Sequence, residues 1–143
     1  NTAPTSNVFS STMSGNWDTN VGLIAYCFAP VEGYSAFGSY TGNGSADGPF
    51  VYTGFRPKYL LIKRTNSSKA WQVMDTERDS FNVADTSLFP AGSDAEASSS
   101  NYDIDFLSNG FKIRTSHESR NGSSDNYIYA AFAEHPFKTS RAR

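Results

Sequence analysis

The sequence has little charge and no long apolar run. Asp, Glu, Lys and Arg make up 18% of the 143 residues, and the formal net charge is −2. So small a charge creates no field that would attract nucleic acid, and we expect no nucleic-acid partner. No stretch approaches the roughly eighteen apolar residues that a membrane-spanning helix needs, so membrane insertion is not expected either.

Cysteine is almost missing. The single cysteine, Cys27, excludes an internal disulfide. It lies within an apolar run, where a free cysteine behaves as a small hydrophobic residue, so we expect it to be buried. The chain also opens Asn1-Thr2-Ala3 without methionine and without a secretory leader pattern, which indicates a fragment or a processed product.

Motifs for catalysis and for cofactor binding are lacking as well. There is no Gly-x-Ser-x-Gly nucleophile elbow, and His117 and His135 match no zinc spacing. The loop Gly42-Asn43-Gly44 lies between expected strands, whereas a phosphate-binding loop precedes a helix. The sequence therefore favours a protein that is not an enzyme and that has no cofactor.

Aromatic residues and turn residues are abundant. The chain has 11 Phe and 8 Tyr, and its short apolar runs are separated by Gly, Ser, Asn and Asp. This pattern predicts an all-β fold, an antiparallel β-sandwich. Strands are expected at 21–28, 34–40, 50–54, 58–65, 70–75, 104–107, 111–115 and 127–133.

Two local patterns are informative. In the 58–65 strand, alternation places Leu60 and Ile62 on one face and Tyr59 and Leu61 on the other. Asn109-Gly110 between two apolar runs predicts a type I′ hairpin, whose twist matches that of the strands. The final strand is expected in the middle of its sheet. A long loop without periodicity, at 76–102, is of the kind that often carries function, and we expect a short helical turn near 93–97 within it.

The first expected strand resembles the last. At an offset of about 104 positions, Ile24, Phe28 and Ala29 align with Ile128, Phe132 and Ala133. Self-similarity at a fixed offset indicates a repeat, so the chain would be one module of a longer array. The predicted organisation is a polar arm or linker at 1–20, one β-sandwich domain at 21–143, a repeat-like unit at about 34–138, and the end of a preceding copy at 21–33.

Candidate binding residues lie in loops, because loops at the ends of a sandwich usually carry its binding site. The loops considered are 41–48, 77–102 and 116–126, together with the hairpin at 108–110. Aromatic rings outside the core, Trp71 among them, are suited to recognising sugars or proteins. The loop residues expected to contact a ligand are Tyr40, Asn43, Asp47, Tyr102, Asn109, His117 and Arg120.

Acidic residues supply two further candidates. Asn101, Asp103 and Asp105 alternate, so their oxygens would share one strand face and could bind Ca²⁺, although a solvated strand edge has the same pattern. Glu77 and Asp79 could act as the paired carboxylates of a glycosidase, although surface ion pairs with Arg78 and its neighbours have the same pattern.

Five blocks of the sequence resemble a domain common in tailed bacteriophages, marine ones in particular. They include Gly38-Ser39-Tyr40-Thr41-Gly42, and they lie in the family's order at 33–50, 54–65, 75–79, 104–112 and 127–138. The resemblance implies a jelly-roll or lectin-like sandwich, often present in tandem copies, in a structural protein on the surface of the virion. It implies a homotrimer and contributes no catalytic residue.

The resemblance leads to one leading hypothesis and two alternatives. The leading one is the C-terminal receptor-binding domain of a tail fibre, which contacts other virion proteins and binds a host-surface glycan or protein. The first alternative is a capsid-decoration or head-fibre protein. The second is a glycan-cleaving enzyme that uses two of the carboxylates of Glu77, Asp79, Asp103, Asp105 and Glu118.

Overall fold

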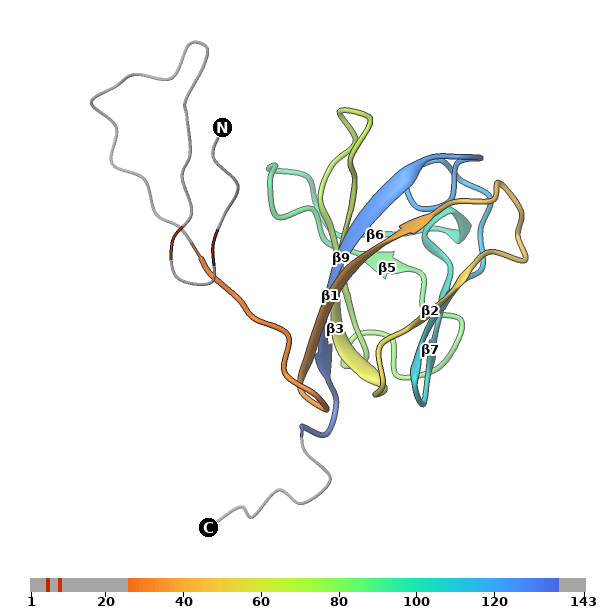
Figure 1. Ribbon diagram of the computed structural model, residues 1–143. Coiled ribbons are helices and arrows are strands. Elements are labelled where there is room, and N and C mark those ends of the chain that lie inside the picture. The colour runs from red at the N-terminus through yellow and green to blue at the C-terminus, as the bar shows by residue number, and fades with distance from the viewer. Residues whose placement is uncertain (1–4, 6–7, 9–25, 137–143) are drawn as a thin grey trace.

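Two antiparallel sheets pack face to face in the computed structural model, which describes residues 5, 8 and 26–136 (Figure 1). The larger sheet has the strand order β1-β9-β3-β4, with β1 at Ser35–Thr41, β9 at Asn126–Ala133, β3 at Pro57–Arg64 and β4 at Gln72–Asp75. The smaller sheet has the order β2-β8-β7, with β2 at Phe50–Tyr52, β8 at Gly110–Ile113 and β7 at Ile104–Leu107. The expected all-β antiparallel sandwich is confirmed.

The last strand occupies the middle of the larger sheet, as predicted. β9 pairs with β1 on one side and with β3 on the other, both antiparallel. Phe132 therefore faces Ser35 across one ladder and Tyr59 across the other. The first and last strands of the sandwich lie side by side, which joins the two ends of the described fold.

The core lies between the two sheets and follows the alternation of the strands. Leu60 and Ile62 of β3 share one face, as the sequence predicted, and this face points into the core, where both are almost fully buried. Phe111 and Ile113 of β8 face them from the smaller sheet. The complete buried cluster consists of Tyr40, Val51, Phe55, Leu60, Ile62, Met74, Ala84, Ile104, Phe106, Phe111, Ile113, Tyr127 and Ala131.

The hairpin between β7 and β8 is present, but its turn is not of type I′. Leu107 pairs with Gly110, so the two turn residues are Ser108 and Asn109. Neither has a positive φ, which a type I′ turn requires. Gly110 is needed for a different reason, because a Cβ there would lie 2.1 Å from the carbonyl oxygen of Val51 on β2.

The long segment at 76–102 contains short elements that the sequence pattern did not predict. β5 at Thr86–Ser87 pairs with β6 at Ala97–Ser98, and a 3₁₀ turn, η1, follows at Ser100–Tyr102. The helical turn expected near 93–97 is therefore wrong by several residues. Ser99 begins η1, because its side chain accepts a hydrogen bond from the backbone N–H of Asn101.

The segment before β1 departs from two expectations. Residues 26–28 belong to no strand, and residues 21–25 lie outside the described part of the chain, as does the arm expected at 1–20 except for Thr5 and Val8. Cys27 is exposed, because its segment runs outside both sheets. Among the residues that the structure describes, no helix has the length and apolar character required to cross a membrane.

We predict that a fragment spanning 34–143 folds cooperatively, because every strand of the two sheets lies between Ser35 and Ala133. Removing the segment before β1 deletes the two ring contacts of Phe28, so the free energy of unfolding should fall by about 1–3 kcal/mol while the fragment stays folded. Urea denaturation followed by circular dichroism measures this. An unfolded fragment would mean that the segment before β1 completes the sandwich.

Candidate functional site

The outer face of the larger sheet is rich in aromatic rings. Alternation along the strands turns Phe37, Tyr59 and Phe132 away from the core. Phe28, from the segment before β1, stacks on Phe37 with 5.8 Å between the ring centroids. Phe132 meets Phe28, Phe37 and Tyr59 edge-on at 5.8–5.9 Å. Each such pair contributes about 0.5–1.5 kcal/mol beyond the area that it buries, so the cluster holds Phe28 against the sheet.

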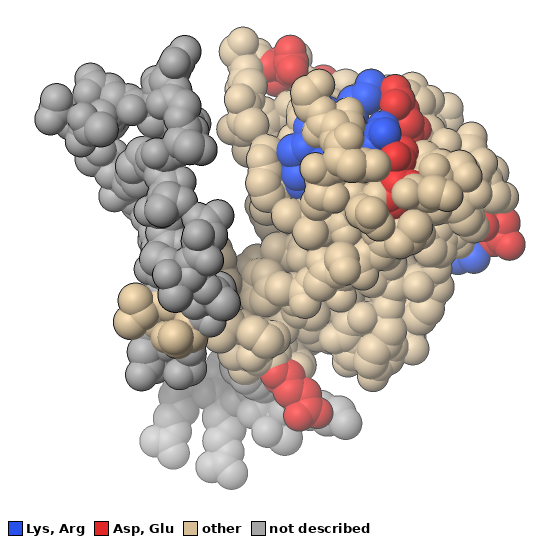
Figure 2. All heavy atoms as spheres, turned by 45° about the horizontal axis from the view of Figure 1, so that its top comes forward, with Lys and Arg blue, Asp and Glu red and all other residues tan. Residues whose placement is uncertain are grey.

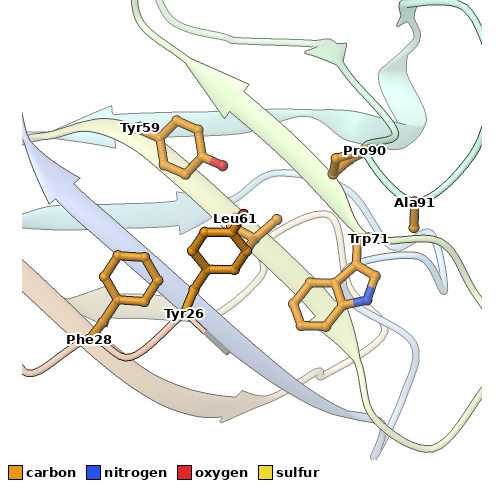
Figure 3. A pocket seen from close by; sticks show the side chains of 7 residues that line it. All are labelled: Tyr26, Phe28, Tyr59, Leu61, Trp71, Pro90 and Ala91. Carbon is orange, nitrogen blue, oxygen red and sulfur yellow. The ribbon is translucent and has the colours of Figure 1, made fainter. Parts of the chain in front are cut away.

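An open groove of about 540 Å³ lies beside this cluster, and we call it the aromatic groove (Figure 3). Its walls come from the segment before β1, from β3, from the residue that precedes β4 and from the turn that follows β5. It is lined by Tyr26, Phe28, Tyr59, Leu61, Trp71, Pro90 and Ala91. None of these side chains is charged, so the groove suits an uncharged ligand surface.

The wall that contains Pro90 and Ala91 is fixed by backbone hydrogen bonds. Leu88 and Val73 exchange two bonds of 2.9 Å, which attach the chain after β5 to the edge of β4. The N–H of Gly92 donates to the carbonyl of Phe89 at 3.1 Å and closes the turn. The wall is therefore an extension of the sheet.

Three polar groups of the groove form no hydrogen bond with the residues that the structure describes. The hydroxyls of Tyr26 and Tyr59 and the indole N–H of Trp71 have no hydrogen-bond partner within the described part of the chain. Burial raises the pKa of Tyr59, and the charge of Arg78 opposes this shift. The Tyr59 phenol is therefore a neutral donor at pH 7. The groove therefore combines aromatic faces with hydrogen-bond donors that could bind acceptor atoms of a ligand.

Sequence patterns identified only part of this groove. Trp71 was among the aromatic rings considered for recognition, and alternation placed Tyr59 and Leu61 together on one face of their strand. Tyr26 and Pro90 were missed, because they reach the groove from segments without periodicity. The only available signal was the density of aromatic residues.

Arg120, predicted to contact a ligand, is instead completely buried. Its guanidinium donates to Gln72 Oε1 at 2.9 Å and to the carbonyl oxygen of Tyr102 at 2.6 Å. It also donates to the sulfur of Met74 and to the hydroxyl of Ser87. No carboxylate within the described part of the chain forms an ion pair with it. Burial lowers the pKa of Arg120 to about 10, which still leaves the group charged at pH 7.

Tyr40, the second expected contact that proves to be buried, faces the core. Its hydroxyl donates to the carbonyl oxygen of Arg120 at 2.8 Å, and its ring stacks on Tyr127 with 5.0 Å between centroids. Both expectations failed for one reason. A Tyr or an Arg beside a polar loop has the same local sequence whether its side chain points outward or inward.

Asn43 and Asp47 are exposed, but both side chains already have hydrogen-bond or ion-pair partners within the protein. Asn43 accepts a 2.9 Å bond from the buried amide of Asn121 and donates to the carbonyl of Asp47 at 2.9 Å. The carboxylate of Asp47 lies 2.7 Å from Lys112 Nζ, and this hydrogen bond lowers the pKa of Asp47. Asn121 also donates to the carbonyl of Thr115, so it ties the 41–48 loop to the 116–126 loop.

The remaining predicted contacts lie apart from one another. Tyr102 is half-buried beneath the guanidinium of Arg120, which lies 5.2 Å from the centre of its ring. His117 Nδ1 lies 2.9 Å from the hydroxyl of Ser119. Asn109 is exposed at the β7–β8 turn, at the other end of the strand from the 41–48 loop. The predicted loops therefore do not form one binding surface.

Charged groups at the loop end of the sandwich pair with each other. Arg64 lies 2.8 Å from Glu118 and 2.7 Å from Asp125, and Lys69 lies 2.7 Å from Glu118. Figure 2 looks onto this end, where acidic and basic side chains gather next to one another. The surface is thus electrostatically balanced, which agrees with the low net charge.

The proposed calcium ligands do not share one strand face. Asn101 lies in η1, and only Asp105 belongs to β7. Asp105 pairs with Arg114 at 3.3 Å, whereas burial raises the pKa of Asp103. Within the described residues, no three His, Cys, Asp or Glu side chains gather as metal ligands would.

Most carboxylates considered for catalysis have structural partners. Glu77 forms an ion pair with Lys58 at 2.5 Å. Asp79 accepts bonds from the N–H groups of Asp85 and Thr86 at 3.1 and 2.8 Å, and from the Thr86 hydroxyl at 3.1 Å. These bonds fix the start of β5.

The fold and the groove together define a β-sandwich with a groove lined by aromatic side chains on its outer face. The sequence of residues 1–136 matches the family described as Domain of unknown function (DUF7483), and the chain belongs to this family. No curated protein and no solved structure matches the chain.

We predict that Arg120→Ala lowers the free energy of unfolding by about 3 kcal/mol or more, because it leaves several buried acceptors without a donor. Urea denaturation measures the loss. Arg114→Ala is the matched control, because the Arg114 side chain is 42% exposed. A loss below about 1 kcal/mol for Arg120→Ala would show that the surroundings rearrange without the guanidinium.

We predict that Tyr40 makes the fold sensitive to alkali. Burial raises its pKa above the ordinary value of 10.0, so its contribution to stability is complete below pH 10 and falls as the pH rises further. The lowered pKa of Arg120 has the opposite effect on stability, because the cost of burying its charge decreases as the pH rises above about 10. Tyr40→Phe should therefore lose stability less steeply above pH 10 than the wild type. Urea midpoints between pH 8 and 11 measure the slope, and Tyr52→Phe, at an exposed site, should match the wild type.

Proposed function

We propose that this chain is a non-enzymatic module of a phage virion, the receptor-binding domain of a tail fibre, and that its aromatic groove binds a host-surface glycan. The observation that carries the proposal is a groove lined by aromatic rings whose polar groups have no hydrogen-bond partner among the described residues. The resemblance of five sequence blocks to a phage domain supports the setting.

The groove has the chemistry that a sugar ring requires. Aromatic faces cover the C–H face of a sugar while burying area at a small cost in conformational entropy. The indole N–H of Trp71 and the hydroxyls of Tyr26 and Tyr59 can donate to sugar oxygens at the rim. Because no charged side chain lines the groove, a neutral glycan fits better than a sulfated or carboxylated one.

The surroundings of the carboxylates favour binding over cleavage. A glycosidase needs two carboxyl groups that face one another across a substrate site. Here Glu77 and Asp79 are engaged by Lys58 and by the start of β5, and neither lines the aromatic groove. The proposal is therefore recognition without chemical change.

We predict that Trp71→Ala weakens binding to host cells and to purified host polysaccharide by about tenfold, because a stacking contact on one ring contributes up to about 1.5 kcal/mol. Binding is measured by cell pull-down and by titration with the polysaccharide, and circular dichroism checks the fold. Phe81→Ala is the control, since Phe81 is 85% exposed but does not line the groove.

Three results would contradict the proposal. Unchanged adhesion of both Trp71→Ala and Tyr59→Ala would exclude the groove. Binding to empty capsids, with antibody label over the virion head, would indicate a capsid-decoration protein. Release of reducing sugar from the polysaccharide would indicate an enzyme.

A further inference from the structure

In the part of the chain that the structure describes, the sheet edges are covered by other backbone on one side of the sandwich and largely uncovered on the other side. On one side, segment 82–88 closes both edges. Leu88 pairs with Val73 on β4, and Ala84 exchanges bonds of 2.8 and 2.9 Å with Ile104 on β7. The side chain of Asn82 completes the cover, because it accepts from the N–H of Phe106 at 2.9 Å and donates to its carbonyl at 3.1 Å. These contacts leave little backbone on that side to pair with another chain.

On the other side, the edge of β1 is open. β1 pairs only with β9, and alternation turns the N–H and C=O groups of Phe37, Ser39 and Thr41 away from that ladder. Within the described residues, only the bridge between Val31 and Ser35 covers this edge, at its beginning. The middle of the strand is exposed at Gly38 and Ser39.

The open edge lacks the features that usually prevent strand pairing. Soluble proteins protect an exposed edge with charged side chains, proline, a bulge or a very short strand. β1 has seven residues, Ser-Ala-Phe-Gly-Ser-Tyr-Thr, with neither a charge nor a proline, and its pairing with β9 runs without a register shift. The open edge of β2 is only three residues long. β1 is thus the longest unprotected edge of the described sandwich.

We propose that two copies of this chain associate by antiparallel pairing of their β1 edges about a two-fold axis at Ser39. In this register Ser39 faces its own counterpart, and Phe37 of each copy faces Thr41 of the other. All three residues direct their backbone groups outward, so about six hydrogen bonds form. The register ends at the next pair, Ser35 with Asn43, because Val31 occupies the backbone groups of Ser35 and the N–H of Asn43 donates to Asn121 Oδ1 at 2.8 Å.

The strand itself selects a second copy as the occupant. An isologous pair needs a self-complementary surface, and an uncharged strand meets its own image without repulsion. Cross-strand neighbours share a face, so the two larger sheets join into one continuous sheet. Both aromatic grooves then open on the same face, an arrangement that suits bivalent attachment to a surface.

The first test is the mass of the full chain in solution, measured by light scattering over a range of concentrations. A dimer is expected for the wild type and for Ser39→Ala. Ser39→Pro should be monomeric, because it removes an outward N–H and leaves the ladder to β9 unchanged. A trimer, a monomer at every concentration, or a dimer that survives Ser39→Pro with its fold intact would overturn the proposal.

A charge exchange tests the register and remains informative if the proline variant unfolds. Ser39→Lys and Ser39→Glu should each weaken self-association at least about tenfold, because like charges meet at the two-fold axis. An equimolar mixture of the two variants should recover dimers. Failure to recover them, with both variants folded, would overturn the two-fold register. Because this readout involves no ligand, it is independent of the proposed glycan binding.

Discussion

A buried guanidinium without a carboxylate partner is the constraint on which much of the structure depends. Removing a charge from water is costly unless hydrogen bonds replace its hydration. Arg120 meets this requirement with neutral acceptors on β4, on β5 and in η1, namely Gln72, Met74, Ser87 and Tyr102. Segment 76–102, which lacks regular periodicity, is thereby held in place by hydrogen bonds to the Arg120 side chain.

The position of β5 then determines two other features. Ser87 contacts the guanidinium, and the next residue, Leu88, pairs with Val73 on β4. This pairing covers the β4 edge and begins the turn that carries Pro90 and Ala91 to the aromatic groove. Residues 87–91 therefore connect the buried guanidinium to the groove. Ser87 accepts a hydrogen bond from Arg120, and Pro90 and Ala91 line the groove.

The loops and the outer sheet face have different roles. The loops at 41–48 and 116–126 are joined by Asn121, and their charged groups pair with each other, so they provide rigidity. The outer face carries exposed rings and unused donors, which are properties of a binding surface. With β1 open and the opposite edges covered, the proposed pairing of two β1 edges would leave the groove free for the proposed ligand.

The sequence by itself determined the fold class, most strand positions and the central place of the last strand. Strand alternation at Leu60 and Ile62 and the apolar runs around the β7–β8 turn are local signals, and they were sufficient. It also placed Trp71 among the aromatic rings outside the core, although it did not indicate Tyr26 or Pro90 as walls of the same groove.

Tertiary structure alone decided which polar residues face inward. Arg120 and Tyr40 have the local sequence of loop contacts, yet they are buried because acceptors and rings distant in the chain meet them there. It also decided that Gly110 serves close packing against Val51, and that Tyr26, Trp71 and Pro90 line one groove. Each of these depends on contacts between residues far apart in sequence, which local periodicity does not encode.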